Sequence, residues 1–366
     1  MFGLGKKKGP QEVSLNSDQY KFEVDPDQNI LDAALKAGVA FPHDCRVGSC
    51  GSCACKLTDG KITATADFSY VLDGDQLKDG MILACQSRAK TPLSIAVEID
   101  GEAKTSPTKS YQGVVNKITP LTHDIMELTV GVEGLEHNGY AGQYSELMVK
   151  QVGSSRSYSF AKAPQNENPN ELSFFIRNVP KGRFSKWLFG KDPTGQKLEV
   201  NTPFGSFYYR DGKGPMVCIA GGSGMSAVKA ILEQAAIDQV ERDAIYLFGA
   251  RTQEDIYSRS DLEDIQKKWN PNYKFEFVYV LNMEPEDSDW TGARGMVTDF
   301  LKSDYIEKGK LNMKECQGYL CGPPPMIDAA IKEFTAEGMS NEEIFFDKFL
   351  DSGSRLSLSN KDLFSW

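Results

Sequence analysis

The sequence predicts a multidomain chain that combines a small α+β domain, an antiparallel β-barrel and a parallel α/β domain. Its 366 residues are too many for one hydrophobic core. The secondary-structure pattern changes along the chain: strands mixed with a short helix come first, then short strands, then strands alternating with helices. Short strands with polar breaks are typical of a barrel, and strands alternating with helices are typical of a parallel sheet.

The predicted domain boundaries follow these changes of pattern. The first domain is expected at residues 11–102, followed by a linker rich in Lys, Thr, Ser and Pro at 103–110. The barrel is expected at 111–213, the α/β domain at 214–350 and a tail at 351–366.

Local patterns predict the elements of the first domain. Apolar and polar residues alternate over 13–15 and 20–24 around a polar turn at 16–18, which indicates a β-hairpin. Residues 30–37 show an amphipathic helical pattern that ends at Gly38, a residue suited to a helix C-terminus.

The other two domains are predicted in the same way. Barrel strands are expected at 113–118, 125–132, 144–149, 172–177 and 197–200, with one helical stretch at 182–188. In the α/β domain, strands are expected at 216–220, 244–248, 275–280 and 319–320, and helices at 227–237, 260–269 and 326–334. Prolines at 323–325 are expected to keep the last helix from starting before Met326.

Four cysteines of the first domain have the spacing of an iron–sulfur site. Cys45, Cys50 and Cys53 form a C-x4-C-x2-C run, and Cys85 follows at a distance, as in plant-type [2Fe–2S] centres. Small residues between them let the backbone wrap closely and point N–H groups at sulfur. A zinc site or a disulfide is the alternative, but zinc usually takes two short pairs of ligands, and disulfide frameworks suit small secreted chains. Cys55 is interpreted as a packed thiol.

The charge balance narrows the function classes. Net charge is −10, and residues 12–102 carry 15 acidic against 8 basic side chains. Nucleic-acid binding is disfavoured, because phosphates need basic surfaces. An acidic domain suits docking to a basic patch on a partner protein, and plain solubility is the alternative. No apolar run approaches the ~20 residues that span a bilayer, and no secretory signal follows the first basic residues, so a cytoplasmic protein is expected.

Two motifs in the barrel segment suit a flavin. In the run Arg156, Ser157, Tyr158, Ser159, the tyrosine offers a flat ring, the last serine a hydrogen bond near flavin N5 and the arginine a cation for a pyrophosphate. Gly182, Arg183 and Ser185 open a helix, and helix N-termini bind phosphate through free N–H groups. A surface strand and an ordinary capped helix are the alternatives.

Two motifs in the α/β segment suit a dinucleotide. Gly221, Gly222, Ser223 and Gly224 lie between a strand and a helix, where glycines let the backbone approach a pyrophosphate; a tight turn is the alternative. Cys321 follows the last apolar strand, at the strand end where α/β proteins bind ligands.

Taken in order, these motifs and a final Asp347-Lys-Phe349 resemble the NADH-dependent reductase components of bacterial multicomponent oxygenases. In that family a β-grasp ferredoxin precedes a ferredoxin–NADP⁺ reductase-like module, and the resemblance extends from about residue 13 to 349. Stretches at 41–50, 187–190 and 294–298 are most similar to the electron-transfer components of xylene monooxygenases.

The resemblance implies a role for each motif. Cys45, Cys50, Cys53 and Cys85 would ligate the cluster, Arg156 to Ser159 would hold FAD, and Gly182, Arg183 and Ser185 would lie near its pyrophosphate. Residues 221–224 would cradle NADH, Cys321 would lie beside the nicotinamide with Asp347 nearby, and Phe349 would stack on the flavin. Ser159, Cys321, Asp347 and Phe349 are thus the expected catalytic residues. Two departures are Ala227, where relatives often carry proline, and the tail beyond Phe349.

The implied activity is electron transfer from NADH through FAD and the [2Fe–2S] cluster to a separate terminal oxygenase. FAD is needed because NADH gives two electrons at once and the cluster accepts one. Glu254 and Asp255 favour NADH over NADPH, because a carboxylate favours a free ribose 2′-OH and repels a 2′-phosphate. The cationic side chain of Arg251 would weakly favour NADPH.

The expected acceptor is a hydrocarbon hydroxylase, with a membrane-bound di-iron enzyme as one form. The chain itself would then reach the inner membrane only through that partner. A Rieske dioxygenase, a soluble di-iron hydroxylase and a deoxysugar-forming enzyme are alternative acceptors. A non-enzymatic iron–sulfur sensor or binding protein is the alternative from another class.

Overall fold

The computed structural model describes residues 9–43, 46, 48, 51–99, 108–136, 139–164 and 168–349. The chain divides into two compact units, Met1–Thr108 and Lys109–Trp366. This division falls inside the predicted linker, and the finer domain boundaries stay a prediction. Of the predicted site residues, Cys45 and Cys50 lie outside the described residues, as does the tail at 351–366.

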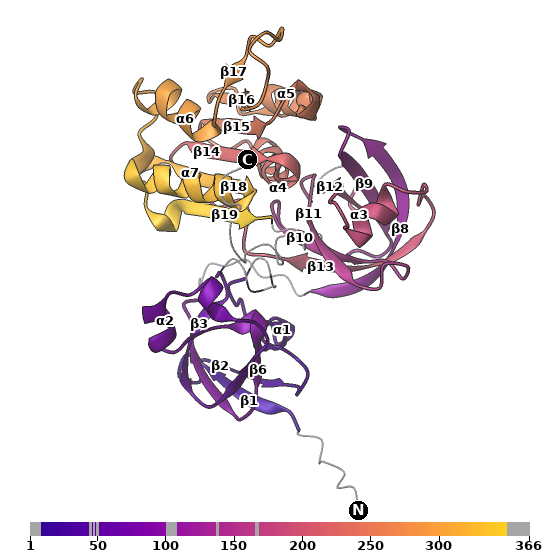
Figure 1. Ribbon diagram of the computed structural model, residues 1–366, viewed down its shortest axis with the longest axis vertical. Coiled ribbons are helices and arrows are strands. Elements are labelled where there is room, and N and C mark those ends of the chain that lie inside the picture. Colours follow the sequence, from indigo (N-terminus) through magenta and orange to yellow (C-terminus); the bar gives the residue numbers. More distant parts are fainter. Residues whose placement is uncertain are drawn as a thin grey trace, which may run out of the picture. The chain divides into compact units, whose positions relative to one another are not determined.

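The first unit is built on a mixed five-stranded sheet with the order β2-β1-β7-β3-β5 (Figure 1). The predicted hairpin is present as an antiparallel pair, and Asn29 caps the predicted helix by accepting from Asp32 N. Gly38 follows this helix with φ +79°, a conformation that glycine adopts without strain. The strands are β1 Gln11–Leu15, β2 Tyr20–Val24, β3 Ala54–Asp59, β4 Ile62–Ala64, β5 Met81–Leu83, β6 Ser87–Ala89 and β7 Leu93–Ala96, and the helices are α1 Ile30–Lys36 and α2 Gly74–Lys78.

The second unit begins with six antiparallel strands in the order β11-β10-β13-β8-β9-β12. Phe160, next to β11, forms an antiparallel bridge with Phe174 in β12, so the two outer strands meet and the sheet curves into a barrel. Apolar residues such as Leu128 and Val130 fill its interior. Its elements are β8 Lys109–Pro120, β9 Ile125–Val132, β10 Tyr144–Met148, β11 Ser155–Ser159, β12 Glu171–Arg177, α3 Arg183–Leu188 and β13 Lys197–Phe204.

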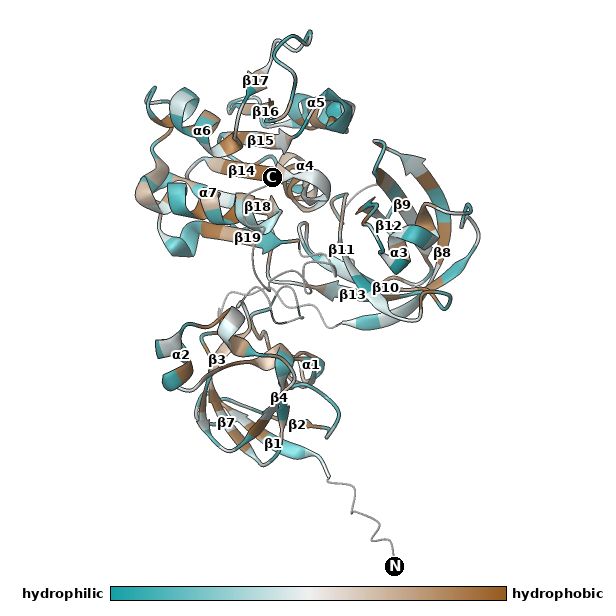
Figure 2. Ribbon diagram, in the orientation of Figure 1, coloured by the Kyte–Doolittle hydropathy of each residue, from teal (hydrophilic) through white to brown (hydrophobic). Residues whose placement is uncertain are grey.

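The rest of the second unit is a six-stranded parallel sheet with the order β17-β16-β15-β14-β18-β19 (Figure 1). The central strands β14 and β15 are rich in apolar residues (Figure 2), as expected for a sheet whose two faces are covered by helices. The elements are β14 Met216–Gly221, α4 Met225–Ile237, β15 Ala244–Ala250, α5 Arg259–Lys268, β16 Phe275–Leu281, β17 Ala293–Arg294, α6 Val297–Leu301, β18 Gln317–Gly322, α7 Pro324–Ala336 and β19 Ile344–Lys348.

Two hydrophobic cores lie on the two faces of this sheet, and successive residues of a strand enter different cores. Cys218 and Ala220 pack with α4 and α5, whereas Val217 and Ile219 pack with α6 and α7. The α4 core also contains barrel residues, among them Phe175. The barrel and the α/β sheet therefore share one continuous core on the α4 side.

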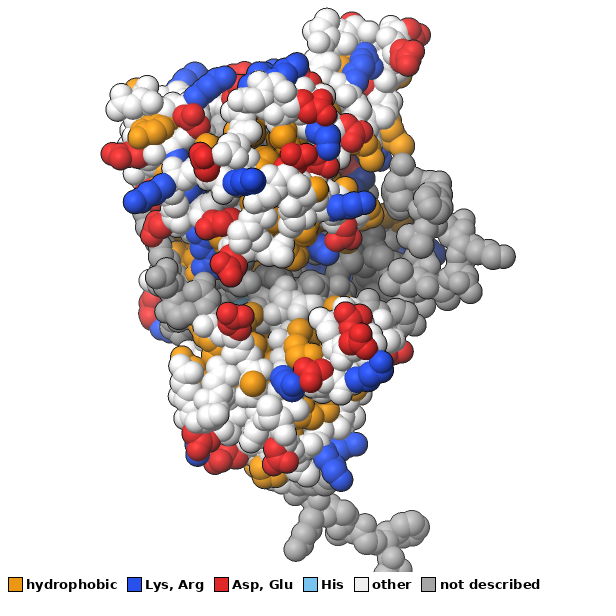
Figure 3. Space-filling view, turned by 90° about the vertical axis from the view of Figure 1, so that its left-hand side faces the viewer, with side chains coloured by type: hydrophobic (Ala, Val, Ile, Leu, Met, Phe, Trp, Pro, Cys, Tyr) orange, Lys and Arg blue, Asp and Glu red, His pale blue; other side chains and the backbone are white. Residues whose placement is uncertain are grey.

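The last helix corrects one sequence prediction. Helix α7 begins at Pro324, with prolines at its first two positions, and not at Met326. The first N–H groups of a helix have no internal partner, so proline is tolerated in the first turn. On the face shown in Figure 3, acidic and basic side chains are interspersed.

Candidate functional site: an electron-transfer centre and a flavin–dinucleotide site

Two of the four predicted cluster cysteines are described, and they lie together. Cys53 and Cys85 are each 3% exposed, and their Sγ atoms are 3.2 Å apart with no disulfide between them. Cys53 immediately precedes β3, and Cys85 lies in the turn between β5 and β6. Residues 32 positions apart in the sequence thus bring two thiols to one point, as a shared metal centre requires.

Gly48, in the described part of the chain near these thiols, has no space for a larger side chain. A β-carbon on Gly48 would lie 2.5 Å from Gln86 Cγ, and both Gly48 and Gly51 have positive φ. The neighbouring Cys55 is 1% exposed, and burial raises its thiol pKa well above the ordinary value. Cys55 lies within β3, where it pairs with Ile82 of β5, and it packs in the core of the first unit, as expected for a packing residue.

The predicted flavin strand is β11. Tyr158 is partly buried there, with its ring 4.9 Å from the ring of Phe184 in α3, and burial raises its phenol pKa. Ser159 is 4% exposed. The structure therefore brings the tyrosine and the start of α3 together, although about 25 residues separate them in the sequence.

Arginines from two predicted motifs come close to the same turn. Arg156 donates to Ser154 Oγ (3.0 Å) and Ser155 O (2.6 Å). A β-carbon built on Gly153 would lie 3.7 Å from Arg183 Nη2. Neither arginine is ion-paired to a carboxylate within the described part of the chain, so both charges are available to an anion. Two such guanidinium groups could hold a pyrophosphate, which is the role predicted for Arg156 and Arg183.

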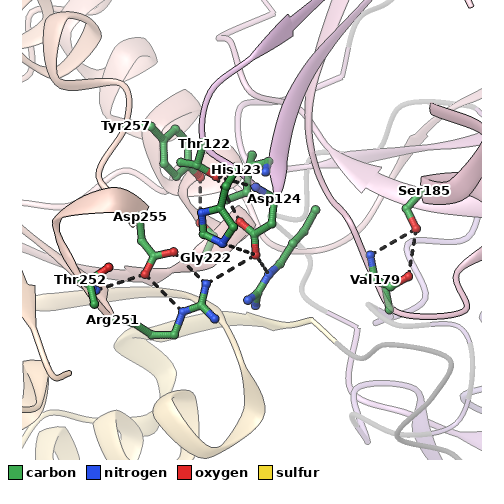
Figure 4. Close-up of polar contacts among 12 residues, drawn as sticks. Thr122, His123, Asp124, Val179, Ser185, Gly222, Arg251, Thr252, Asp255 and Tyr257 are labelled. Atoms are coloured by element: carbon green, nitrogen blue, oxygen red, sulfur yellow. Dashed lines mark hydrogen bonds and ion pairs between the residues drawn. The ribbon is translucent and has the colours of Figure 1, made fainter. Parts of the chain in front are cut away.

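The structure gives the other two residues of this motif a local role. The Ser185 hydroxyl accepts from Val179 N and lies within hydrogen-bonding distance of Val179 O, each at 3.2 Å (Figure 4). A β-carbon on Gly182 would lie 2.5 Å from Ser185 Oγ. Both residues therefore fix the turn that precedes α3.

The predicted dinucleotide turn lies between β14 and α4. Gly222 has φ +56°, and its carbonyl accepts from Tyr257 Oη at 2.8 Å. A β-carbon on Gly224 would lie 2.3 Å from Cys321 O, so only glycine allows the turn to approach β18 this closely. The glycine pattern thus reflects close packing of the turn against β18 as well as access for a ligand.

Strand pairing assembles the remaining predicted site residues. Cys321 in β18 faces Asp347 in β19 in parallel register, and Phe349 N donates to Gly322 O at 2.8 Å. Cys321 has no exposed surface, Asp347 is 9% exposed, and Phe349 packs against the core that the sheet shares with the barrel. These three residues and the glycine turn consequently lie on the barrel side of one sheet end.

An ion-pair network beside this turn was not anticipated as a feature of the sequence. Arg177, the last residue of β12, donates to Asp124 Oδ2 at 2.9 Å. Arg251, just after β15, lies 3.6 Å from the same oxygen, and both Arg251 and Asp124 are labelled in Figure 4. Asp124 thereby joins the barrel to the α/β sheet. The sequence gives little indication of this network, because Asp124, Arg177 and Arg251 lie far apart in the chain and form no motif.

The same network changes the interpretation of the acidic pair at 254–255. Arg251 binds Asp255 through two hydrogen bonds, of 2.8 and 3.2 Å, whereas Glu254 is exposed. His123, Asp124 and Asp255 come close enough to suggest a metal site. Both carboxylates are already neutralised by guanidinium groups, however, so the cluster is better described as an ion-pair network.

Family comparisons agree with this arrangement. Residues 13–90 match the 2Fe-2S iron-sulfur cluster binding domain, residues 112–209 the oxidoreductase FAD-binding domain and residues 218–332 the oxidoreductase NAD-binding domain. Together, the fold and the matches define a flavin-dependent oxidoreductase joined to a ferredoxin domain.

Comparison with individual proteins shows which kind of flavin-dependent oxidoreductase the chain resembles. The chain is 40% identical over 338 residues to the xylene/toluene monooxygenase electron transfer component XylA of Pseudomonas putida, covering 92% of this chain and 93% of that protein. It is 29% identical over 343 residues to the reductase component of propane 2-monooxygenase of Mycolicibacterium smegmatis, covering 92% and 97%. The crystal structure of the Amycolatopsis cytochrome P450 reductase GcoB superimposes with a TM-score of 0.80 at 28% identity, covering 93% and 98%.

The chain therefore belongs to the family of ferredoxin-containing reductases that serve as electron-transfer components of bacterial oxygenases. It is an oxidoreductase with sites for a [2Fe–2S] cluster, FAD and a nicotinamide dinucleotide. None of the helices in the described ranges combines the length and the apolar character needed to cross a bilayer.

Proposed function

We propose that this protein oxidises NADH and delivers the electrons one at a time to a separate terminal oxygenase that hydroxylates a hydrocarbon. The observation that carries the proposal is the assembly of Cys321, Asp347 and Phe349 beside the glycine turn, on the sheet face that shares a core with the barrel. A nicotinamide at this sheet end would lie on the side of the sheet that packs against the barrel. Bound FAD would supply the conversion of a two-electron donor into single electrons.

The residues of the chain bind and orient in this proposal. Tyr158 presents its ring to the flavin, and Arg156 and Arg183 neutralise its pyrophosphate. Residues 221–224 bring backbone N–H groups to the dinucleotide, and the N-terminus of the 13-residue helix α4 favours its negative charge. Cys321 and Asp347, both buried, exclude water from the nicotinamide pocket.

NADH is the proposed donor in preference to NADPH. Asp255 and Asp124 both lie next to Arg251, so the cationic side chain that would otherwise attract a 2′-phosphate is already paired. The sequence argument was that Glu254 and Asp255 repel a 2′-phosphate, and the pairing of Arg251 with Asp255 adds a second reason.

The proposed acceptor is an oxygenase because several similar proteins are electron-transfer or reductase components of oxygenases. The xylene/toluene and propane proteins are named as components of monooxygenases, and another relative is named as the electron transfer component of toluate 1,2-dioxygenase. We favour a hydrocarbon monooxygenase, with membrane-bound di-iron hydroxylases as the first class to test. We also propose a cytoplasmic location, since thiols that bind iron require a reducing compartment.

An anaerobic titration with NADH, followed by visible absorption and electron paramagnetic resonance, tests the proposal. We expect the flavin absorption to bleach and a rhombic signal of a reduced [2Fe–2S] centre to grow in the same titration. Flavin bleaching without that signal, in protein with full iron content, would refute electron delivery through the ferredoxin domain. No bleaching at all would support the sensor or binding-protein alternative.

A further inference from the structure

Lys229 is a charged side chain in an unusual position. It lies on α4 and is only 3% exposed, in the core that the α/β sheet shares with the barrel. A lysine is rarely buried to this extent unless its charge is compensated. No motif in the sequence marks this residue.

The contacts of Lys229 cross from the α/β sheet to the barrel. Its Nζ donates to Ala161 O at 2.9 Å, and it lies 5.9 Å from the ring centroid of Phe175 in β12. Two carboxylates compensate the charge: Glu233 Oε2 at 3.9 Å and Asp261 Oδ2 at 3.8 Å. One helix turn further along α4, Glu233 accepts from Ala163 N at 2.8 Å. Two side chains of α4 therefore hold the backbone of the same barrel segment, 161–163.

Both ends of this connection lie close to the proposed reactants. Ala161 comes two residues after Ser159, which corresponds to about 7 Å of extended chain. Lys229 comes five residues after Gly224, which corresponds to about 7.5 Å along the helix. The Lys229–Ala161 bond thus joins the flavin strand to the helix that carries the dinucleotide turn, by a short path on each side.

We propose that Lys229 is a positioning residue that sets the distance between the nicotinamide and the flavin by holding residues 161–163 against α4. The inference rests on the proposed function, since it takes β11 as the flavin strand and 221–224 as the dinucleotide turn. Hydride transfer needs reacting atoms within about 3.5 Å, and a misplacement of about 1 Å costs roughly a hundredfold in rate. A side chain that fixes this distance affects the chemical step more than the binding of either ligand.

The test compares wild-type protein with Lys229→Met, which keeps an unbranched side chain as far as the ε position but removes the donor and the charge. Lys302→Met is the control, because Lys302 pairs with Glu333 and Glu337 and its contacts do not involve the barrel. Stopped-flow mixing with NADH and 4-deuterated NADH gives the limiting rate of flavin reduction, the apparent Kd for NADH and the isotope effect. We expect Lys229→Met to lower the limiting rate tenfold to a hundredfold, with a larger isotope effect and a Kd within about twofold of wild type.

A second measurement does not depend on activity. Hydrogen–deuterium exchange in FAD-free protein is expected to be faster in peptides covering 159–164 in Lys229→Met, and unchanged there in Lys302→Met. A limiting rate or exchange pattern equal to wild type would overturn the inference. If Lys229→Met does not fold, Lys229→Gln replaces it; its amide donor is one bond shorter, and a wild-type limiting rate in the folded variant would again overturn the inference. If the wild-type flavin is not reduced by NADH, the proposed function itself fails.

Discussion

Cys321 and Asp347 occupy facing positions on the parallel strands β18 and β19, so a buried thiol and a buried carboxylate lie side by side at one sheet end. The pairing continues through Phe349 N, which donates to Gly322 O. Residues that sequence reasoning could only associate by family resemblance are thus joined by backbone hydrogen bonds. Because the glycine turn packs on Cys321 O, a change in either strand is expected to reach the dinucleotide site.

Gly224→Ala tests this packing. The new methyl group would lie 2.3 Å from Cys321 O, which forces the turn or β18 to move. We expect the apparent Kd for NADH to rise at least about tenfold with FAD content unchanged, measured by anaerobic flavin reduction at increasing NADH. Gly74→Ala, where nothing lies within 4 Å of the added carbon, is the control. Wild-type NADH affinity in Gly224→Ala would contradict the proposed role of the turn.

Cys53→Ser tests the metal centre. Loss of one thiolate is expected to reduce iron from about two atoms per chain to a small fraction, because the cluster needs all four ligands. Flavin reduction by NADH should persist, while cytochrome c reduction should fall at least about tenfold. The matched control is Cys55→Ala, which changes a buried cysteine outside the predicted ligand set. This variant should retain its full iron content. Equal iron loss in both variants would argue against the ligand assignment.

Tyr158→Ala tests the flavin strand. Removing the ring takes away the proposed stacking surface and the packing on Phe184, and we expect FAD to bind about tenfold more weakly. The apo-protein should lose about 1–3 kcal/mol of unfolding free energy. Tyr158→Phe keeps the ring and should retain most FAD affinity. Fluorescence titration of apo-protein with FAD gives these values, and equal affinity in Tyr158→Ala and wild type would rule out the stacking role.

The Arg251–Asp255 pair predicts a pH dependence of stability. Burial opposes ionisation of Asp255, but hydrogen bonds from Arg251 and Thr252 N outweigh it and lower the pKa below the ordinary 3.8. The ionised carboxylate therefore stabilises the folded state above about pH 4, and this contribution is lost as pH falls through the lower folded-state pKa. Asp255→Asn should lower the thermal midpoint at pH 7 and approach wild type near pH 3. The exposed Glu254, changed to Gln, should differ little from wild type at either pH. A constant difference between Asp255→Asn and wild type at all pH values would disprove this linkage.

Much of the fold could be predicted because its signals are local. The strand at 125–132 was predicted with the bounds that the structure shows, and the alternating strands and helices after residue 214 identified a parallel sheet. The start of α7 was predicted wrongly, because the proline rule was applied without the exception for the first helical turn.

The site was predictable only where a motif carries it. The cysteine spacing and the glycine turn are local patterns, so they can be recognised in a single sequence. Asp124, Arg177 and Lys229 act through partners that lie far away in the chain, and an isolated lysine in an amphipathic helix usually faces solvent. Only the packing of α4 against the barrel shows that Lys229 is buried.

Strand β19 is the last element in the described part of the chain, and this late position affects the order in which the parts of the protein are synthesised. A ribosome that has finished β14 and the glycine turn must still add more than a hundred residues before Asp347 and Phe349 emerge, a delay on the order of ten seconds. During this interval the iron–sulfur unit is already complete in sequence, whereas the nicotinamide pocket lacks one wall. A nascent chain therefore contains all four predicted cluster cysteines before it contains Asp347 and Phe349.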